Sequence, residues 1–447
     1  MEYNVLDFGA AGDGVTLDTR AIQAAVDACR TNGGGKVVLP GGRVYRSGML
    51  TLCSNLELHL EMGAVLRGSD DLNDYLPTGG SSGSDELRGV PSYVNCSYTG
   101  APNHFFLYAR GCANLAVTGL GTIDGNQEAF FGTVTKWHIE GAFYPRAPML
   151  FFENCDHVTL RDVTLTKSAF WTVHLVGCRD VLIDGLRILN DLRMANCDGI
   201  DPDHCQNVRI ANCHIQCADD CIVFKNTRAA MEYGPCENIT VTGCTLTSTS
   251  AAVKFGTESE GAFRNILVEN CVISRSNRGI SLQLRDGGSI ENASFRNIAI
   301  DTRLFHPEMY WGSAEPIAVT VLRRREDAPV GTICNVLFSG ILCAGENGIL
   351  LWSEAPGGIS GLTFENVSLR LREATGWQKG LHDLRPNFGG AAAEAGLAYV
   401  CARHVSESAF RHCRFTADEA MGKLIAAPFR TTGCGELGLS GGCHGLS

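Results

Sequence analysis

The chain has 447 residues, a hydrophobic content of 45% and a formal net charge of −11. Its length would accommodate two or three ordinary domains, and its apolar content supports a large core. The acidic balance argues against nucleic acid as a partner, and an acidic substrate would need a locally basic groove. No apolar run approaches the ~20 residues of a membrane-spanning helix, so no membrane partner is expected.

Residues 1–70 are predicted to form an N-terminal cap. Val5 to Phe8 is interpreted as a strand, Asp18 to Arg30 as an amphipathic helix, and Val37 to Leu39 as a second strand. A polar-faced helix over the first coil would protect the exposed end of a repeat protein. The stretch from Asp70 to Gly100 is rich in Gly, Ser, Asp and Tyr, and such a long loop either covers a site or is partly disordered.

From residue 158 onward, an apolar pattern recurs in one register. Each unit begins at an anchor residue, and further apolar residues follow two, five and seven positions later. The alternation has period two, so each unit is expected to contain two short strands with a turn between them. The anchors are Val158, Val181, Val208, Ile239, Ile266, Ala293, Val336 and Leu362.

Units of roughly 20–30 residues repeated in series are typical of solenoids. The predicted fold class is all-β, a right-handed parallel β-helix with an N-terminal helical cap and long loops. Equivalent side chains would stack in rows about 4.8 Å apart. The whole chain, 1–447, is expected to be one domain, with the cap and first coils in 1–70, loop-rich coils in 70–145, catalytic coils in 146–370 and C-terminal coils in 371–447.

Two further irregular segments are predicted, at 301–332 and at 370–400. The first contains the basic run Arg323 to Arg325. This run is interpreted as a solvated surface, with a rim that grips carboxylates as the alternative. Strands near Tyr399 and Phe415 are expected to complete the chain.

The 20 cysteines are interpreted as small buried hydrophobes rather than as disulfides or metal ligands. Six of them precede an apolar anchor by three residues, and several others occupy apolar slots of the repeat. So many thiols suit a reducing compartment. The first residues, Met1 to Val5, also lack the basic and apolar regions of a signal peptide. The expected location is therefore cytoplasmic.

Three carboxylates, those of Asp198, Asp219 and Asp220, fall within the repeat. Asp198 follows its anchor by 17 residues, and Asp219 and Asp220 follow theirs by 11 and 12, so all three are expected on neighbouring coils of one face. Glycoside hydrolysis needs one acid and one base, and repulsion between neighbouring carboxylates keeps one of them protonated. The alternative is that Asn196 and Asp198 merely cap turns.

The motifs around these acids are specific. Asn196-Cys-Asp-Gly-Ile-Asp-Pro-Asp203 and Ala218-Asp-Asp-Cys-Ile-Val-Phe-Lys225 resemble the Asn-x-Asp and Asp-Asp motifs of the polygalacturonase family of glycoside hydrolases, family 28. Similar stretches are Leu6 to Asp13, Gly121 to Gly125 and Phe170 to Leu175. The resemblance covers about residues 4–300 well.

The resemblance implies a right-handed β-helix and inverting, single-displacement hydrolysis without a metal or other cofactor. Asp219 would be the general acid, while Asp198 and Asp220 would activate the water. The implied substrate is an oligosaccharide of acidic pectic sugars, with exo release of galacturonic acid as the main hypothesis. The alternatives are a rhamnogalacturonan-directed galacturonohydrolase or another glycosidase on this fold, a polysaccharide lyase, and a non-catalytic carbohydrate-binding β-helix.

Two motifs of the family are changed. Ser250-Ala-Ala252 stands in place of Gly-His-Gly, and Ser281-Leu-Gln283 stands in place of Arg-Ile-Lys. Lys254 and Arg285 are therefore candidates to bind the sugar carboxylate. The other predicted substrate-binding residues are Asn196, Lys225, His174 and His204. Tryptophans that either stack on sugars or lie in the core are Trp137, Trp171, Trp311 and Trp352.

Overall fold

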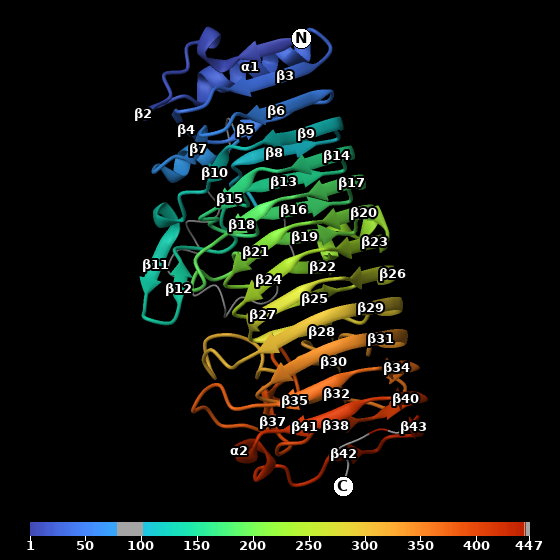
Figure 1. Cartoon of the computed structure of the whole chain (residues 1–447). Coiled ribbons are helices and arrows are strands. Elements are labelled where there is room, and N and C mark those ends of the chain that lie inside the picture. The colour runs from blue at the N-terminus through green and yellow to red at the C-terminus, as the bar shows by residue number, and fades with distance from the viewer. Residues whose placement is uncertain (78–101, 442, 444–447) are drawn as a thin grey trace. The chain divides into compact units, whose positions relative to one another are not determined.

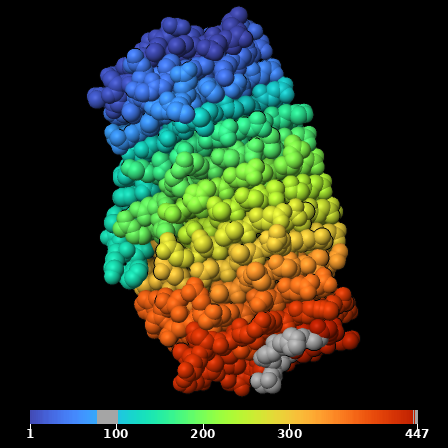
Figure 2. Space-filling model, in the orientation of Figure 1, coloured from blue at the N-terminus to red at the C-terminus, as the bar shows by residue number. Residues whose placement is uncertain are grey.

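The computed structural model describes residues 1–77, 102–441 and 443 (Figure 1). They form two compact units, unit 1 (Met1–Asp219) and unit 2 (Asp220–Ser447). Each unit consists of coils of right-handed parallel β-helix, which confirms the predicted fold class. In Figure 2 the coils of each unit cross the visible face as successive bands of side chains. The predicted loop from Asp70 to Gly100 lies mostly outside the described residues, and the single domain stays a prediction.

The N-terminal cap of unit 1 contains the predicted helix. Helix α1 (Thr19–Thr31) buries Ile22, Ala25, Val26 and Cys29, which are on its predicted apolar side. The predicted strand over Val5–Phe8 is wrong, because this segment is the 3-10 helix η1. Here the Asn4 side chain caps the Leu6 amide at 3.0 Å, and Gly9 ends the turn with a left-handed φ of 92°. Local capping therefore outweighed the apolar composition.

The coils of unit 1 are built from parallel ladders, to which each coil adds one strand. One ladder comprises β1 (Glu2–Asn4), β3 (Gly35–Leu39), β6 (Leu56–Leu60), β9 (Ala113–Gly119), β14 (Asp156–Arg161), β17 (Arg179–Asp184) and β20 (Gln206–Ala211). A second comprises β2 (Asp13–Leu17), β4 (Val44–Ser47), β7 (Val65–Gly68), β10 (Thr122–Asp124), β15 (Thr164–Thr166), β18 (Arg187–Leu189) and β21 (His214–Cys217). A third comprises β5 (Leu50–Thr51), β8 (Leu107–Arg110), β13 (Leu150–Glu153), β16 (Val173–Val176) and β19 (Ile200–Asp203). Outside the ladders are η2 (Leu72–Tyr75), η4 (Gln127–Phe130) and the antiparallel hairpin of β11 (Phe131–Val134) and β12 (Ile139–Gly141).

Unit 2 repeats the arrangement with longer strands. One ladder comprises β23 (Cys236–Thr242), β26 (Ala262–Glu269), β29 (Ser289–Thr302), β31 (Thr332–Gly345), β34 (Leu362–Glu365), β40 (Ser408–Arg411) and β43 (Leu437–Ser440). A second joins β24 (Thr245–Ser248) and β27 (Val272–Ser276) to β29, β31, β35 (Ser368–Leu371) and β41 (Arg414–Ala417). A third comprises β22 (Ile222–Asn226), β25 (Ala251–Ser259), β28 (Arg278–Leu284), β30 (Ile317–Val321), β32 (Ile349–Ser353), β38 (Val400–Arg403) and β42 (Phe429–Thr432).

Smaller elements complete unit 2. They are η5 (Arg228–Tyr233), the paired strands β33 (Ile359–Ser360) and β39 (Val405–Ser406), the antiparallel hairpin of β36 (Leu381–Asp383) and β37 (Ala392–Glu394), and helix α2 (Glu419–Gly422). The predicted irregular segment 370–400 therefore contains a hairpin, and 301–332 contains β30 after a loop. No helix in the described part of the chain has the length and apolar character needed to cross a membrane.

The pairing register is the one that the apolar anchors predict. In unit 1, Val181 pairs with Val208. In unit 2, Ile239 pairs with Ile266, and Ala293 pairs with Val336. All of these side chains are buried, and full burial of a Val or Ile side chain contributes about 1.5–3 kcal/mol. The predicted repeat is therefore confirmed in both units.

A column of asparagines turns the chain before four of the five anchors of unit 2, and Gly361 takes this place before Leu362. Asn238, Asn265, Asn292 and Asn335 have left-handed φ values of 59°, 55°, 57° and 53°. Asparagine tolerates this conformation better than other residues with a Cβ. The side chains also bond along the column, with Asn265 Nδ2 donating to Asn238 Oδ1 at 3.0 Å and Asn292 Nδ2 donating to Asn265 Oδ1 at 3.3 Å. The column thus fixes both the turn and its register.

All described cysteines are free thiols, and most of them are buried. In unit 1, Cys178 Sγ contacts Phe152 O and Cys205 Sγ contacts Leu175 O, each at 3.2 Å. They fill apolar rows of the coils, as the sequence predicts. The cytoplasmic location inferred from them stays a prediction.

The asparagine column predicts a graded stability effect at Asn265. Asn265→Ala should lower the free energy of unfolding by about 2–3 kcal/mol, because it adds the left-handed penalty to the loss of ladder hydrogen bonds. Asn265→Gly, the matched control, removes only the hydrogen bonds and should cost about 1 kcal/mol. Urea unfolding measures both values. Equal losses, or a larger loss for glycine, would contradict this account.

Candidate active site

The Asn196 to Asp198 segment of unit 1 is held by a buried arginine that sequence reasoning did not select. Arg146 Nη2 donates to Ala195 O at 2.5 Å and to Asn196 Oδ1 at 3.4 Å, and Nε donates to Ala169 O at 2.7 Å. Burial disfavours the charged guanidinium and lowers the pKa of Arg146 to about 10. A lone arginine carries no sequence signal, yet these contacts fix the backbone that leads into Asp198.

Unit 1 brings two of the predicted catalytic residues together. Asp198 is buried, at 2% exposure, whereas Asp219 is partly exposed. A carboxylate oxygen of one lies within 4.8 Å of an oxygen of the other. Thr172 N donates to Asp198 O at 2.9 Å, and Ala218 N donates to Cys197 Sγ at 3.3 Å. The second contact ties the turn before Asp219 to the segment that carries Asp198.

Carboxylate oxygens are also ligands that hard cations accept. Ca²⁺ and Mg²⁺ take about six or more oxygen ligands, so the oxygens of Asp198 and Asp219 would form only part of a coordination shell. The expectation that no metal takes part stays a prediction.

The two predicted histidines of unit 1 lie beside one carboxylate at the end of β19. His174 Nε2 lies 3.4 Å from Asp203 Oδ2, and His204 Nε2 lies 3.8 Å from Asp203 Oδ1. All three side chains are buried. His174 also stands edge-on to Trp171, with ring centroids 4.6 Å apart. The structure therefore brings both histidines to Asp203, and their role in binding substrate stays a prediction.

In unit 2, the first residue is Asp220, and its carboxylate accepts contacts from β25 and the turn before it. Lys254 Nζ lies 2.7 Å from Oδ2, while Ser250 Oγ and Ala251 N donate to Oδ1 at 2.9 and 3.1 Å. Ser250 and Ala251 belong to the stretch that replaces the Gly-His-Gly motif. The altered stretch and the predicted cation Lys254 thus converge on Asp220, a link that the sequence alone did not show.

Lys225 is committed to a buried ion pair in unit 2. Its Nζ lies 3.3 Å from Glu258 Oε2, and Glu258 Oε1 lies 3.5 Å from Arg324 Nη1. Burial raises the pKa of Glu258, but the two cations Lys225 and Arg324 outweigh it, so the pKa is lowered overall. Lys225 is 3% exposed, and its predicted role in binding substrate stays a prediction.

The basic run Arg323 to Arg325 is ion-paired, and its interpretation as a solvated surface is wrong for Arg324, whereas the Arg323 and Arg325 side chains are 35% and 26% exposed. The Arg324 side chain is only 4% exposed, and its Nε donates to Asp286 Oδ1 at 2.8 Å. Arg325 Nη1 also reaches Asp286 at 2.8 Å, and Arg323 pairs with Glu354. Asp286 and Glu354 are distant from these arginines in sequence, so the residues around the run could not reveal them, although Asp327 also lies 3.4 Å from Arg325 Nε.

Arg285, the second predicted carboxylate ligand, is directed into unit 2. Its Nη1 donates to Leu284 O at 2.8 Å and to Thr320 Oγ1 at 3.1 Å, and its Nη2 donates to Leu384 O at 3.4 Å. The residue is 1% exposed, and burial lowers its pKa to about 9. Its predicted contact with substrate stays a prediction.

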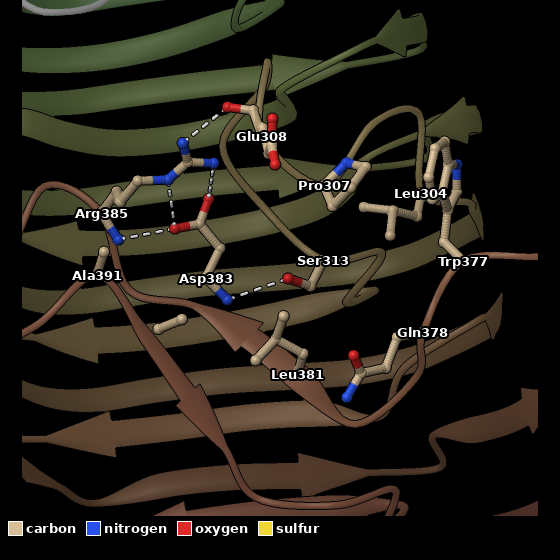
Figure 3. Close-up of a pocket in the computed structure, with 11 residues that line it drawn as sticks. Leu304, Pro307, Glu308, Ser313, Trp377, Gln378, Leu381, Asp383, Arg385 and Ala391 are labelled. Atoms are coloured by element: carbon tan, nitrogen blue, oxygen red, sulfur yellow. Dashed lines mark hydrogen bonds and ion pairs between the residues drawn. The ribbon is translucent and has the colours of Figure 1, made fainter.

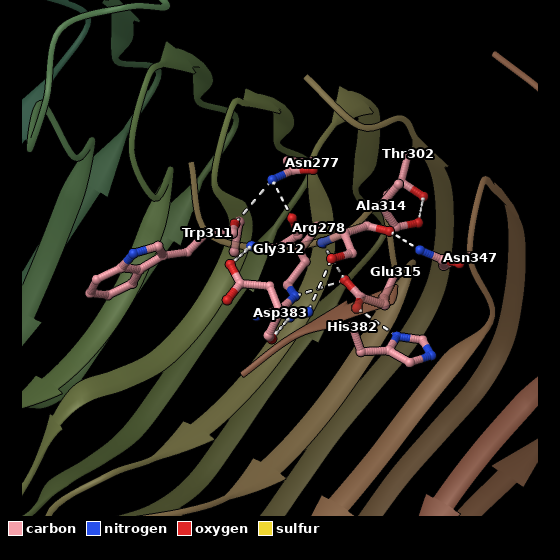
Figure 4. Close-up of polar contacts among 12 residues, drawn as sticks. Asn277, Arg278, Thr302, Trp311, Gly312, Ala314, Glu315, Asn347, His382 and Asp383 are labelled. Atoms are coloured by element: carbon pink, nitrogen blue, oxygen red, sulfur yellow. Dashed lines mark hydrogen bonds and ion pairs between the residues drawn. The ribbon is translucent and has the colours of Figure 1, made fainter. Parts of the chain in front are cut away.

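Trp311 is the tryptophan that lies near a predicted site residue in unit 2. Its ring centroid is 5.5 Å from Lys254 Nζ, and the indole is partly exposed. Its main chain is held by Asn277 Nδ2, which donates to Trp311 O at 3.0 Å and to Gly312 O at 3.2 Å (Figure 4). Of the other candidates, Trp171 is buried at 3% exposure, while Trp137 is 42% exposed.

The loop that bears Trp311 is anchored by a buried charge cluster. Arg278 Nε donates to Glu315 Oε2 at 2.9 Å, and His382 Nδ1 lies 2.9 Å from Glu315 Oε1 (Figure 4). Burial disfavours the His382 imidazolium, but hydrogen bonds to Cys401 and Glu315 outweigh it and raise the pKa of His382 to about 9. Burial likewise disfavours the Glu315 carboxylate, but Arg278 and His382 lower the pKa of Glu315 to about 2. Near neutral pH, Glu315 is therefore ionised and His382 is protonated, and the ion pairs between these charges hold the loop in place.

The fold and the close pair of aspartates in unit 1 define the class of protein. The class is a parallel β-helix with two carboxylates close enough to act as acid and base in glycoside hydrolysis.

Comparisons with known proteins agree with this class. Residues 92–304 match the pattern of Glycosyl hydrolases family 28, and residues 3–59 match that of Rhamnogalacturonase A/epimerase, pectate lyase-like. A probable polygalacturonase of Vitis vinifera is 29% identical over 310 residues, which are 67% of this chain and 60% of the relative. An exo-poly-alpha-D-galacturonosidase of Dickeya chrysanthemi is 25% identical over 341 residues, which are 66% of this chain and 54% of the relative.

Solved structures share the fold. The family 28 exopolygalacturonase of Yersinia enterocolitica superposes with a TM-score of 0.72 at 21% identity, over 98% of this chain and 78% of that one. The exopolygalacturonase of Thermotoga maritima superposes with a TM-score of 0.64 at 20% identity, over 99% of this chain and 92% of that one. The chain is therefore similar to glycoside hydrolase family 28 over residues 92–304. The alignments span little more than half the length of the Vitis and Dickeya relatives.

The anchoring cluster predicts how stability depends on pH. The His382 pKa is raised from 6.5 to about 9 by folding, so its contribution is complete below pH 6.5 and is lost as the pH rises through about 9. The free energy of unfolding of the wild type should therefore fall toward that of His382→Gln over this range, by a few kcal/mol at about 1.4 kcal/mol per pKa unit. The exposed control His157→Gln should follow the wild type. A constant difference between the wild type and His382→Gln in urea unfolding at pH 6, 7.5 and 9.5 would refute the prediction.

Proposed function

We propose that this protein hydrolyses oligosaccharides of acidic pectic sugars and acts in the exo mode, releasing galacturonic acid. The observation that carries the proposal is the pair of close carboxylates, Asp198 and Asp219, followed directly by Asp220 with its own set of donors. The similarity to the exo-poly-alpha-D-galacturonosidase of Dickeya and to the exopolygalacturonases of Yersinia and Thermotoga supports the exo mode.

The different exposures of the three aspartates support different catalytic roles for them. Asp219 is partly exposed, whereas Asp198 and Asp220 are buried. We assign proton donation to Asp219, because a general acid must reach the glycosidic oxygen of the substrate. Asp220 accepts from Ser250 Oγ, Ala251 N and Lys254 Nζ, so its carboxylate is held in one position. We therefore assign activation of the water to Asp220 together with Asp198.

Lys254 is the cation that best suits a uronate carboxylate. One of its three N–H donors is directed to Asp220 at 2.7 Å, which leaves donors for a second anion. A lysine that bridges the base and the sugar carboxylate would position the uronate and the water together.

Neutralising each acid tests the assignment. Asp219→Asn should abolish turnover and keep the fold, because it removes the proton donor at nearly constant volume. Asp198→Asn and Asp220→Asn should lower kcat by at least about 10²-fold. The matched control is Asp301→Asn, an acid outside the site that is 35% exposed, and it should keep wild-type rates. Wild-type rates in the three site variants would reject the site.

The assay also separates the alternative functions. Reducing sugar released from pectic oligosaccharides indicates hydrolysis, while ultraviolet absorbance of an unsaturated product would indicate a lyase. Binding without turnover would indicate a carbohydrate-binding β-helix. Release of galacturonic acid alone supports the exo mode, whereas a ladder of shorter oligosaccharides opposes it.

We also propose that the anomeric configuration is inverted. Inverting enzymes usually separate acid and base by about 6.5–9.5 Å and retaining ones by about 5 Å. Oxygens of Asp198 and Asp219 lie within 4.8 Å of each other, so inversion requires these two side chains to diverge across the bound sugar. NMR of the product in the first minutes should show the inverted anomer. A retained anomer, or a trapped glycosyl-enzyme, would instead assign an aspartate as nucleophile.

A further inference from the structure

Unit 2 contains a pocket of about 430 Å³ that the proposed reaction does not use (Figure 3). It lies between the loop after β29 and the segment of the β36–β37 hairpin. Its apolar lining consists of Leu304, Pro307, Trp377, Leu381, Ala391 and Ala392. Figure 3 shows the Trp377 ring beside Leu304 and Pro307 on one side of the pocket. A pocket with an aromatic wall and a few polar groups is typical of a small-ligand site.

The polar groups of this pocket carry an excess of negative charge. Glu308, Asp383 and Arg385 line it. Arg385 is already paired, because its Nε and Nη2 each lie 2.9 Å from an Asp383 oxygen, while its Nη1 donates to Glu308 O at 2.8 Å. The positive charge of the Arg385 guanidinium is balanced by the Asp383 carboxylate, so the Glu308 carboxylate gives the lining a net negative charge. The lining therefore disfavours a ligand with a carboxylate.

The walls of the pocket are preorganised. Gly312 N donates to Asp383 Oδ2 at 2.8 Å, and Asp383 N donates to Ser313 Oγ at 3.0 Å. The ring of Trp377 is edge-on to His306, with centroids 5.4 Å apart. Since the lining is held by contacts between the loop and the hairpin, little conformational entropy is lost when a ligand enters.

The pocket shares its loop with the proposed active site. Ser313 lines the pocket, and Trp311, two residues earlier, contacts Lys254, the partner of Asp220. One loop thus connects the wall of the pocket to a cation that we assign to the substrate.

We propose that this pocket binds a neutral glycosyl unit that carries a methyl group, either a 6-deoxyhexose or a methyl-esterified uronosyl residue, and that it selects decorated pectic oligosaccharides. The inference rests on the proposed function, because that function makes a sugar the expected ligand. The apolar face of the sugar stacks on Trp377, and the methyl group fills the space beside Leu304 and Leu381.

Ligand-observed NMR with the full chain tests this site. The probes are methyl α-L-rhamnopyranoside, the methyl ester of methyl α-D-galactopyranosiduronate, and the same glycoside as the free acid. At least one of the two neutral probes should bind, and the one that binds identifies the source of the methyl group. The free acid should bind at this pocket at least about tenfold more weakly, because it would bury a third carboxylate there.

Variants assign the binding to the pocket. Trp377→Ala should weaken binding of the neutral probe about tenfold. The affinity of Trp377→Phe should lie between that of Trp377→Ala and that of the wild type. Phe388→Ala is the matched control, because this aromatic residue of the same segment is 56% exposed and does not line the pocket. It should bind as the wild type does. Neutral-probe binding that is unchanged in Trp377→Ala, or free acid bound as tightly in a Trp377-dependent way, would overturn the proposal.

Failure of this inference is distinguishable from failure of the proposed function. Hydrolysis of unbranched galacturonic acid oligosaccharides by the wild type, without Trp377-dependent binding of a neutral probe, rejects the pocket alone. Trp377-dependent binding without hydrolysis of any pectic oligosaccharide supports the pocket and rejects the hydrolase.

Discussion

In-register stacking of coils within each unit determines where every functional side chain lies. A coil buries its apolar residues only against the next coil, and a slip of one residue would turn all of them toward solvent. The rows that follow are therefore fixed. In unit 1, His174 is opposite Asp201, and in unit 2, Lys254 is opposite both Val223 and Ser281. A side chain reaches the site because its distance from the nearest anchor puts it in the right row.

The proposed site contains charged side chains that are buried, although charged side chains in proteins are usually exposed. Asp220, Lys254, Glu258 and Arg324 are charged groups with little access to water, and each would be costly to bury alone. Pairing removes that cost but adds little net stability, since the Coulombic gain is largely offset by desolvation. What the pairs provide is position. An aspartate that accepts from a lysine, a hydroxyl and an amide has one orientation, as acid–base catalysis requires.

The repeating parts of this protein and the amphipathic helix α1 were predictable, because each has a periodic apolar pattern, whereas segments shaped by single contacts were not. Ile239 and Ile266 were placed correctly because the same period recurs along the chain. The Val5–Phe8 segment was misassigned because one asparagine cap and one glycine override its apolar composition.

The site divides in the same way. The proximity of Asp198 and Asp219 was predicted from motif and register, whereas Arg146 was missed, because its partners are main-chain carbonyls of distant segments. Asp286 and Glu354, which pair with the Arg323 to Arg325 run from distant parts of the sequence, were missed for a related reason. Such contacts leave no local pattern, so only the folded coils reveal them.

The altered Ser281-Leu-Gln283 stretch contacts a segment that lines the pocket of unit 2. Where the family has Arg-Ile-Lys, this chain has Ser281-Leu-Gln283, and Gln283 Nε2 donates to Arg385 O at 3.3 Å. That position no longer supplies a cation and instead supports the segment whose Arg385–Asp383 pair lines the pocket. Gln283 thus supports the main chain of a segment that lines the pocket, and Lys254 is the cation in contact with Asp220 among the described residues.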